Sequence, residues 1–436
     1  MNTRIYDPLY GLIELNDLEY KILLTPEIQR LRYVRLCNIN SLLITGASEI
    51  SRFEHIVGVL KLTKEWVKSN KLIDKYESQN LCIAAIMHDM LTGPFGHSVQ
   101  YIFEDNEFEN IFVHENLSLG SKNKYYQDIF ALTSFAGKQF QTEKILDKEQ
   151  FLIINDLIKG RGKYGKLISG TIDFDNIDNV IRLGYHVGIA NRKDAKAAVD
   201  LVKDINIKNN MLICSSKFIT TIERWQKIRK RLYTILLYDW ADFSAKAMLT
   251  SAVEAAIQEG IMGLESWQLT DIELLNFLSD KSVGENQEIS RLIKRIKTGE
   301  LFYPVALLYT NNIVYYKTIS KIRKKRFFEN EIKKIIKKYY SASTNCIFFP
   351  ILDNKKTERA IDIIVRESNK VRTIGNNSEQ LLIGIFLSTK IRNNYVKKIK
   401  NEIYNLLRNE GILNIKELSD PFEKDYNHHN KQLDLF

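Results

Sequence analysis

Proline, cysteine and long apolar runs are all scarce in this chain of 436 residues. The 6 prolines leave room for long uninterrupted helices, and the 4 cysteines lie far apart in apolar surroundings. Such spacing matches no zinc ribbon and predicts buried, reduced thiols in a cytoplasmic protein. No apolar run approaches the roughly 20 residues of a membrane span, and no signal peptide is evident, so no membrane partner is expected. The cysteines are Cys37, Cys82, Cys214 and Cys346.

Acidic residues are fewer than basic ones, 53 against 63, which gives a formal charge of +10. The excess is concentrated in the segments 224–231, 321–338 and 390–400. These segments are typical either of the solvated faces of amphipathic helices or of surfaces that meet phosphates. Charge alone does not choose between a nucleotide, a nucleic acid and neither, so a nucleic-acid partner is compatible with the sequence but not required.

The first 300 residues are predicted to be mostly helical. Apolar residues recur at three- and four-residue spacing over 55–68, 81–90 and 243–257. A further helix is predicted to begin with Thr25 as N-cap and Pro26 at its first position. This pattern indicates one large helical unit.

After about residue 300 the pattern changes to short β-branched runs bounded by Asn, Asp, Gly or Lys, which predict strands. A helix over 401–411 alternates with them. The predicted fold is therefore mainly α, with a helical core over 1–300, a smaller α+β lobe over 301–418 and a polar tail over 419–436. The predicted strands are 311–319, 345–352, 359–368 and 381–389.

Histidine is also rare, with 7 in the chain, and five of them lie in the first half. His88 and Asp89 end an apolar helical run, where burial of the pair costs free energy unless a partner such as a metal ion compensates. Adjacent helical residues point about 100° apart, so the pair can hold one ion only at a helix end or a bend, which 91–96 supplies. His55 and a carboxylate from 173–180 would complete such a site. A His-Asp dipeptide alone is a weak signal, and a lone His in an apolar helix is usually a packed core residue.

A set of motifs in a fixed order makes the signal specific. With these segments the chain resembles the HD-domain deoxynucleoside triphosphate triphosphohydrolases. The resemblance extends over most of residues 1–410 and implies the helical HD core of that family. The motifs are IYDPLYGLIEL (5–15), TPEIQRLRYVRL (25–36), GASEISRFEHIVGVL (46–60), MHDMLTGPFGHS (87–98), HEN (114–116) and DFDNIDNVIRLGYHVG (173–188).

The resemblance implies four metal ligands, and all four residue types are present. Two imidazoles and two carboxylates favour one divalent transition metal, Fe, Mn, Zn or Co, while Mg would accompany substrate phosphates. Asp173 and Asp178 would then be structural, through helix capping or salt bridging. The implied ligands are His55, His88, Asp89 and Asp175.

The resemblance also implies hydrolysis at the α-phosphorus of a nucleoside triphosphate, releasing nucleoside and inorganic triphosphate. The metal would activate water and polarise a phosphoryl oxygen. Arg52 would reach substrate phosphate. His97 would protonate the departing 5′ oxygen with help from His114, because imidazole titrates near working pH.

The departures from the family pattern fall close to the substrate. Gln100 stands where an acidic residue usually orients the catalytic histidine, and a Gln cannot stabilise imidazolium as a carboxylate does. Leu91 and Thr92 replace the usual Gly-His. The positions of sugar-reading residues are also changed, so sugar and base selection are expected to differ. Those positions are Leu36, Asn179 and Leu183.

A regulatory nucleotide site is retained only in part. Gln29 and Arg32 match residues that bind an activating guanine nucleotide in relatives, but Leu24 stands at the position of the Asp. Guanine selection by that carboxylate is not expected, and activation by another nucleotide or by none stays open. Family members assemble as oligomers, so at least a dimer is expected.

Three functions fit these residues. The leading hypothesis is a dNTP triphosphohydrolase, with antiphage defence by nucleotide depletion as a role. The second is a phosphohydrolase of a signalling or cyclic nucleotide, which the altered sugar contacts favour. The third is a catalytically weak nucleotide sensor, favoured by Gln100 and opposed by the complete ligand set.

Overall fold

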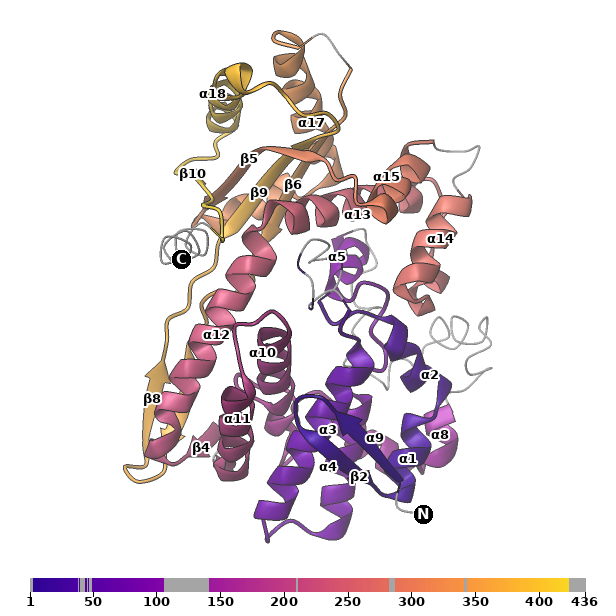
Figure 1. The fold of residues 1–436 in the computed structure, drawn as a ribbon, viewed down its shortest axis with the longest axis vertical. Coiled ribbons are helices and arrows are strands. Elements are labelled where there is room, and N and C mark those ends of the chain that lie inside the picture. The colour runs from indigo at the N-terminus through magenta and orange to yellow at the C-terminus, as the bar shows by residue number, and fades with distance from the viewer. Residues whose placement is uncertain are drawn as a thin grey trace, which may run out of the picture.

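The structure is a computed structural model that describes residues 3–422 with gaps (Figure 1). His114 and the part of the tail from residue 423 onward lie outside the described residues. Within the described part, no helix combines the length and the apolar character needed to cross a bilayer. The gaps are position 38 and the positions and segments 40–43, 45, 47–48, 106–140, 209–210, 282–286 and 341–342.

Helices dominate the molecule, which confirms the prediction of a mainly α fold with a smaller α+β lobe. The four cysteines are buried free thiols, as expected. The helices before the lobe are α1 (Asp17–Leu23), α2 (Pro26–Gln29), α3 (Arg52–Ser69), α4 (Lys75–Met87), α5 (His97–Asp105), α8 (Gln141–Ile145), α9 (Lys148–Ile158), α10 (Phe174–His186), α11 (Arg192–Asp204), α12 (Ile219–Tyr238), α13 (Trp240–Gln258), α14 (Asp271–Lys281) and α15 (Gln287–Thr298).

Helix α3 is the centre of the helical core. It packs against α4, α10 and α11, and α10 in turn packs against α12. The N-cap Ser51 fixes the start of α3 by accepting a hydrogen bond from the backbone N–H of Glu54. The fully buried Trp66 anchors its far end, where the indole N–H donates to the carbonyl of Ile205 at 2.7 Å. Helix α3 therefore holds the residues of its first turns in a fixed position.

The C-terminal lobe is built on an antiparallel sheet in the order β10-β5-β9-β6. Helices α17 and α18 cover one face with a core of their own, and α13 lies under the other face, where Phe243 meets Phe349 and Phe386 (Figure 1). The elements of the lobe are β5 (Tyr303–Thr310), α16 (Tyr316–Ile319), α17 (Ile322–Lys337), β6 (Cys346–Leu352), β9 (Leu381–Leu387), α18 (Asn393–Asn409) and β10 (Lys416–Glu417).

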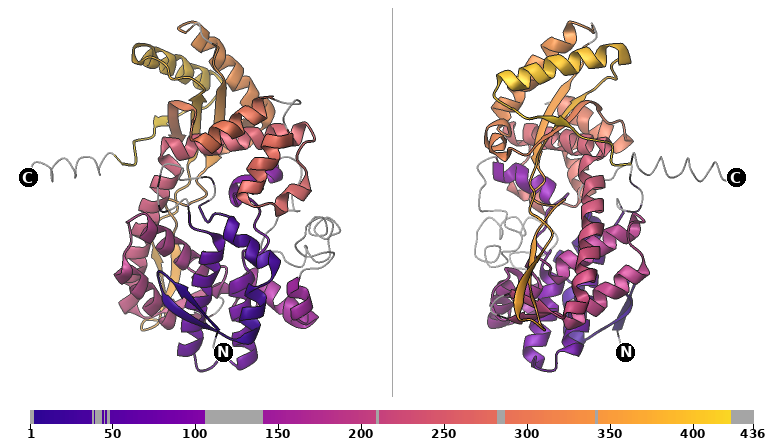
Figure 2. Two further views of the ribbon diagram at one scale, coloured as in Figure 1. Left: turned by 45° about the vertical axis from the view of Figure 1, so that its right-hand side comes forward. Right: turned by 90° about the vertical axis from the view of Figure 1, so that its left-hand side faces the viewer.

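The chain leaves the lobe after β6 and returns to the helical core. There β7 pairs in parallel with β4, with Ile213 opposite Ile364, in a second sheet of order β3-β4-β7-β8 beside α12 (Figure 2). The β6–β7 loop, residues 353–360, thus connects the lobe to the helical core. A domain boundary near residue 300 stays a prediction. The remaining strands are β1 (Thr3–Asp7), β2 (Gly11–Leu15), β3 (Asn206–Lys208), β4 (Met211–Cys214), β7 (Ile361–Val365) and β8 (Lys370–Ile374).

One local prediction was wrong, and another was confirmed with a different side-chain contact. The segment 311–319 is helical rather than extended, because the Asn312 side chain accepts a hydrogen bond from the N–H of Val314 and starts a 3₁₀ turn that continues into α16. The strand of this region is β5, immediately before it. Thr25 is the N-cap of the helix that begins at Pro26, as predicted, although its hydroxyl donates to the carbonyl of Ile22 at 2.8 Å and makes no cap hydrogen bond.

Candidate metal centre

The His-Asp pair lies at a helix end followed by a sharp turn, as expected. Helix α4 ends at Met87, and His88 is its C-cap. Phe95 and Gly96 both have left-handed backbone conformations, with φ of 52° and 51°. Gly93 packs so closely on Trp267 that an added Cβ would lie 2.6 Å from the indole ring. The turn is therefore fixed by tertiary packing as well as by its own residues.

Buried polar groups hold this turn from outside. The Arg30 guanidinium donates to the carbonyl oxygens of Thr92 and Gln268, at 2.7 and 2.6 Å. The Asp271 carboxylate accepts a hydrogen bond from the backbone N–H of Phe95 at 2.7 Å. Burial lowers the pKa of Arg30 to about 10, so the group stays charged at neutral pH. These bonds position the segment that carries His88 and Asp89.

The four expected ligands come together from three elements. His55 Nε2 from α3 lies 3.3 Å from His88 Nε2 and 2.9 Å from Asp175 Oδ1 of α10. His88 Nε2 lies 3.9 Å from Asp89 Oδ2 and 3.8 Å from Asp175 Oδ1. Ligand atoms of His55, His88 and Asp89 all lie within 4.8 Å of one another, and all three side chains are buried.

The proton positions in this cluster fit a cation at its centre. His88 Nδ1 lies 2.9 Å from the Ala85 carbonyl, so it carries a proton and leaves a lone pair on Nε2. His55 Nδ1 donates to Asp178 Oδ2 at 2.7 Å, which directs its Nε2 to the same point. Ligands about 2.1 Å from one ion lie roughly 3–3.5 Å apart. The donor set is that of a divalent transition metal.

The ligands are held by a second layer of charged groups. Asp178 is fully buried and also accepts from Arg182 Nε at 2.9 Å. On the other side, Arg52 Nη1 donates to Asp89 Oδ2 at 2.7 Å. Burial alone would lower the pKa of His55, but its hydrogen bonds to Asp175 and Asp178 raise it to about 9. The cluster therefore favours a positive charge at His55 Nε2, which a metal ion would supply in place of the proton.

Asp173 and Asp178, the other two aspartates of segment 173–180, have structural roles, as expected, and Asp178 also contacts the ligand His55. Asp173 is the N-cap of α10 and accepts from the N–H of Asn176 at 2.6 Å. Asp178 pairs with Arg182 and also orients the ring of His55. Sequence reasoning did not anticipate that contact. Its three-residue spacing from Asp175, which places both carboxylates on one helix face, was the available signal.

The cluster forms one wall of a cavity of about 290 Å³. His97 and Arg52 line the same cavity, and His97 Nδ1 lies 3.1 Å from Gln100 Oε1. The His97 ring also stacks on Tyr101, with centroids 5.9 Å apart. Of the sequence-predicted catalytic residues, the structure thus brings Arg52 and His97 to the metal cluster. The position of His114 is outside the described residues.

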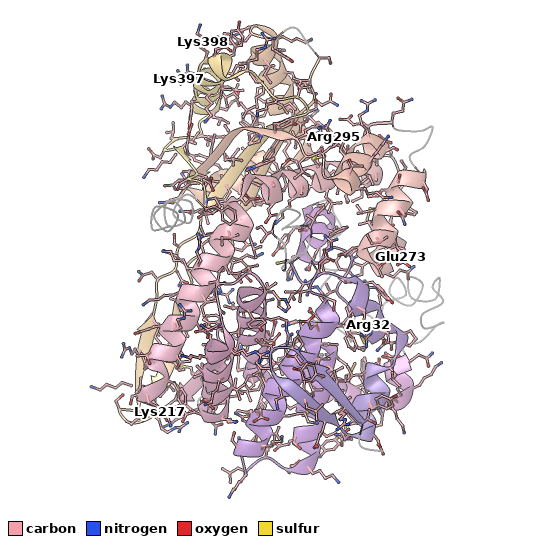
Figure 3. All side chains as sticks on the ribbon, in the orientation of Figure 1. Arg32, Lys217, Glu273, Arg295, Lys397 and Lys398 are labelled. Atoms are coloured by element: carbon pink, nitrogen blue, oxygen red, sulfur yellow. The ribbon has the colours of Figure 1, made fainter. Side chains whose placement is uncertain are left out.

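Gln29 and Arg32 lie together at a different place. Arg32 Nε donates to Gln29 Oε1 at 2.8 Å, and the guanidinium lies 3.7 Å from the centre of the Phe53 ring. Arg32 and Glu273 line a second cavity of about 560 Å³ at the outer side of the turn region (Figure 3). Leu24, at the position of the family's Asp, is largely exposed.

Three cations of the main cavity were not anticipated as site residues. Arg229 comes from α12, and Lys356 and Arg359 come from the β6–β7 loop. Arg229 belongs to the basic segment 224–231, which was noted for its charge only. Nothing local distinguishes Lys356 and Arg359, because only the return of the chain from β6 to β7 brings them to the cavity.

Comparison with known proteins gives relatives at low identity. No model of a known protein family matches the chain. The human deoxynucleoside triphosphate triphosphohydrolase SAMHD1 is 28% identical over 235 residues, which cover 48% of this chain and 37% of that protein. An uncharacterised protein of Methanocaldococcus jannaschii is 24% identical over 348 residues, covering 76% of this chain and 64% of that protein. The chain thus spans less than two thirds of either relative.

A solved structure shares the fold. The crystal structure of a phosphohydrolase from Bacteroides thetaiotaomicron matches with a TM-score of 0.62 at 18% identity, covering 88% of this chain and 99% of that one. The sequence relatives, this common fold and the His-His-Asp cluster agree with one another. Together they support an HD-domain, dNTPase-like family as the family of this chain.

Proposed function

We propose that the chain hydrolyses deoxynucleoside triphosphates to nucleoside and inorganic triphosphate. One divalent transition metal, Fe, Mn, Zn or Co, would be held by four side chains, with Mg accompanying the substrate phosphates. The observation that carries this proposal is the convergence of two imidazole nitrogens and two carboxylates on one wall of a cavity. The ligands are His55, His88, Asp89 and Asp175.

The side chains around the metal ligands, Arg52 and Asp178, have separate roles in this reaction. When bound, the metal supplies Lewis acidity toward water and toward a phosphoryl oxygen. Arg52 is held beside the cluster by Asp89, and its Nε is buried without a hydrogen-bond partner among the described residues, so it can donate to a phosphate oxygen. Asp178 keeps the His55 ring in the orientation that directs Nε2 toward the ligands.

His97 is the proposed general acid. Gln100 Oε1 accepts from Nδ1–H, and the stacked Tyr101 fixes the plane of the ring. This arrangement leaves Nε2–H as the proton to transfer to the departing 5′ oxygen. Gln100 orients the ring without adding negative charge, so the protonated form gains less stabilisation than it would from a carboxylate. Assistance by His114 stays a prediction.

Product analysis tests the reaction. The Mn²⁺-loaded protein is incubated with each dNTP and NTP, and the products are identified by mass spectrometry. We expect nucleoside and inorganic triphosphate from at least one dNTP, and none from Asp89→Ala protein. Release of diphosphate or monophosphate products from every nucleotide would refute the proposed bond cleavage.

A second candidate is hydrolysis of a signalling or cyclic nucleotide. Leu36, Asn179 and Leu183 line the cavity near the cluster, where the resemblance predicts residues that read the sugar of a dNTP. A cavity altered at these positions favours a different sugar or base. The same product analysis separates this candidate from the first by release of a linear nucleotide or a monophosphate, and a nucleotide sensor would give no product.

Regulation and assembly are further parts of the proposal. The joined side chains of Gln29 and Arg32, beside the second cavity, support binding of an anionic activator there. We expect at least a dimer, as in the family that the chain resembles. Light scattering with and without nucleotides that shows only monomer would contradict this. A role in antiphage defence would follow from depletion of dNTPs in the cytoplasm.

A further inference from the structure

One wall of the cavity, outside the metal cluster, carries positive charge. Helices α10 and α12 pack side by side (Figure 1), and Arg229 of α12 lines the cavity. The β6–β7 loop adds Lys356 and Arg359. Among the described residues that line the cavity, these three and Arg52 are the Lys and Arg side chains, whereas Asp89 and Asp175 are the carboxylates.

The hydrogen bonds that Arg229 and Arg359 make within the described part of the chain go to neutral oxygens. Arg229 Nη1 donates to the Lys355 carbonyl at 3.1 Å, and its Nε is buried without a hydrogen-bond partner. Arg359 Nη1 lies 3.5 Å from the Asn176 amide oxygen, next to the ligand Asp175. Arg229 is only 2% exposed. The carboxylate of Asp353 attracts Arg229 and Lys356, so one negative charge meets three cations, and an anionic ligand would balance the excess.

The conformation of the β6–β7 loop, which carries Lys356 and Arg359, is fixed by hydrogen bonds within the loop. The fully buried Asp353 accepts from the backbone N–H of Lys355 at 2.9 Å and from the Thr357 hydroxyl at 2.6 Å. Asn354 and Lys355 both have left-handed conformations, with φ of 51° and 57°. Such consecutive residues persist only where surrounding contacts hold them.

Side chains of helix α12 hold the β6–β7 loop through a hydrogen bond and an ion pair. Gln226 Nε2 donates to the carbonyl of Arg359 at 2.6 Å, and Lys230 pairs with Glu358. Burial, together with the charges of Arg229 and Arg359, lowers the pKa of Lys356 to about 8. The charge of Asp353 acts in the opposite direction, so the lowered pKa of Lys356 reflects burial together with an excess of positive charge over this one carboxylate.

We propose that Arg229, Lys356 and Arg359 form a polyphosphate subsite that binds the phosphates beyond the one placed at the metal. This inference rests on the proposed function, whose substrate is a nucleoside triphosphate. Arg359 contacts Asn176, the neighbour of the ligand Asp175 in the chain, and the charges of Arg229 and Arg359 both act on Lys356, so the three cations lie close together in the lining. With a divalent ion balancing Asp89 and Asp175, the cavity keeps the net positive charge that a polyphosphate neutralises.

Binding of inorganic tripolyphosphate to the Mn²⁺-loaded protein tests the subsite by calorimetry at fixed salt. We expect Lys356→Gln and Arg359→Gln each to weaken binding by about tenfold, the loss typical of one hydrogen bond to a charged group. Lys356→Arg should retain most of the affinity. Orthophosphate, which occupies the metal end alone, should bind all variants equally.

Two matched controls remove one positive charge from the same elements. Lys355→Asn lies in the same loop, is exposed, and keeps a residue that tolerates the left-handed backbone. Lys227→Gln removes an exposed charge from α12. Both should bind tripolyphosphate as the wild type does. Circular dichroism of every variant verifies that the fold is intact.

The outcomes separate this subsite from the proposed reaction. Wild-type protein that does not bind tripolyphosphate, or folded Lys356→Gln and Arg359→Gln variants that bind it as tightly as the wild type, would overturn the subsite even if dNTPs are hydrolysed. If both variants lose binding and the wild type releases no triphosphate from any nucleotide, the subsite stands and the proposed reaction is wrong.

Discussion

The metal wall and the cationic wall of the cavity differ in how their charged side chains are paired. On the metal wall each charged group meets one of opposite sign, as in Arg52 with Asp89 and Arg182 with Asp178. On the wall made by α12 and the β6–β7 loop, Arg229 and Arg359 are hydrogen-bonded to a carbonyl and an amide oxygen. The first wall is internally balanced, whereas on the second the three cations outnumber the one carboxylate, Asp353, that attracts Arg229 and Lys356.

This difference separates what each wall contributes. A closed network fixes ligand geometry before any metal arrives, because moving one member breaks a buried pair. A wall with an excess of positive charge instead favours an anionic ligand, and that ligand completes the charge balance. The metal wall therefore sets where the chemistry happens, and the cationic wall selects what is brought to it.

The largest effect is expected from breaking the metal wall itself. Asp89→Ala removes a ligand and leaves Arg52 without its carboxylate, so bound metal and dNTP hydrolysis should both fall to background. Elemental analysis of the purified protein measures the metal directly. The control Asp200→Ala removes an exposed carboxylate from α11 and should change neither quantity. A full complement of metal in Asp89→Ala protein would remove the basis of the site.

The metal wall was also the part that the sequence revealed best. The resemblance to the family assigned Asp175, whereas His88, Asp89 and the turn after them could be located by local reasoning because they adjoin in the sequence. The fold class, the helices over 55–68 and 243–257 and the strands over 345–352 and 381–389 were predicted for the same reason.

The cationic wall escaped prediction because its position is a tertiary property. Lys356 and Arg359 lie in a polar loop that resembles any solvated turn, until the pairing of β7 with β4 brings it to α12. The strand predicted over 311–319 failed for a related reason. Its β-branched residues suit a strand, but the Asn312 side chain accepts a hydrogen bond from the N–H of Val314 and starts a 3₁₀ turn directly after β5.

The next effect concerns the acid that lies between the two walls. His97→Ala should keep its metal and lose about 10²–10⁴-fold in turnover, the usual contribution of a general acid. Gln100→Glu places a carboxylate on Nδ1 and should be tolerated or raise the rate. Steady-state rates with metal content measured in parallel check both. Near-normal turnover in metal-replete His97→Ala protein would move the role to His114, and loss of metal would make His97 structural or a ligand.

A smaller effect is expected from loosening the support of the metal wall while keeping its ligands. Asp178→Asn preserves shape but removes the charge shared by His55 and Arg182, so metal affinity should fall by about 10–100-fold. Competition with a chelating dye measures the affinity. Asp173→Asn, which keeps an N-cap side chain on the same helix, is the matched control and should bind metal almost normally. Equal losses in both variants would mean that helix stability, not ring orientation, sets the affinity.

The smallest effect concerns the free energy of unfolding that is lost because buried positive charges lie close together near the cationic wall. Lys246 of α13 lies near Lys356, and burial together with that charge lowers its pKa from 10.5 to about 7. Below pH 7 both folded and unfolded chains carry the proton, so the folded state bears an unfavourable buried charge. Between about pH 7 and 10.5 the unfolded state binds more protons, and stability rises with pH.

Lys246→Met should therefore raise the free energy of unfolding by about 1 kcal/mol near pH 6. The gain should shrink as pH rises toward 10, because the wild type then loses the same charge. Thermal unfolding of both proteins across this range checks the trend, and Lys227→Met on the exposed side of α12 should show none. A gain that does not change with pH would assign the effect to added apolar packing, and a loss would mean that Lys246 stabilises the wall it adjoins.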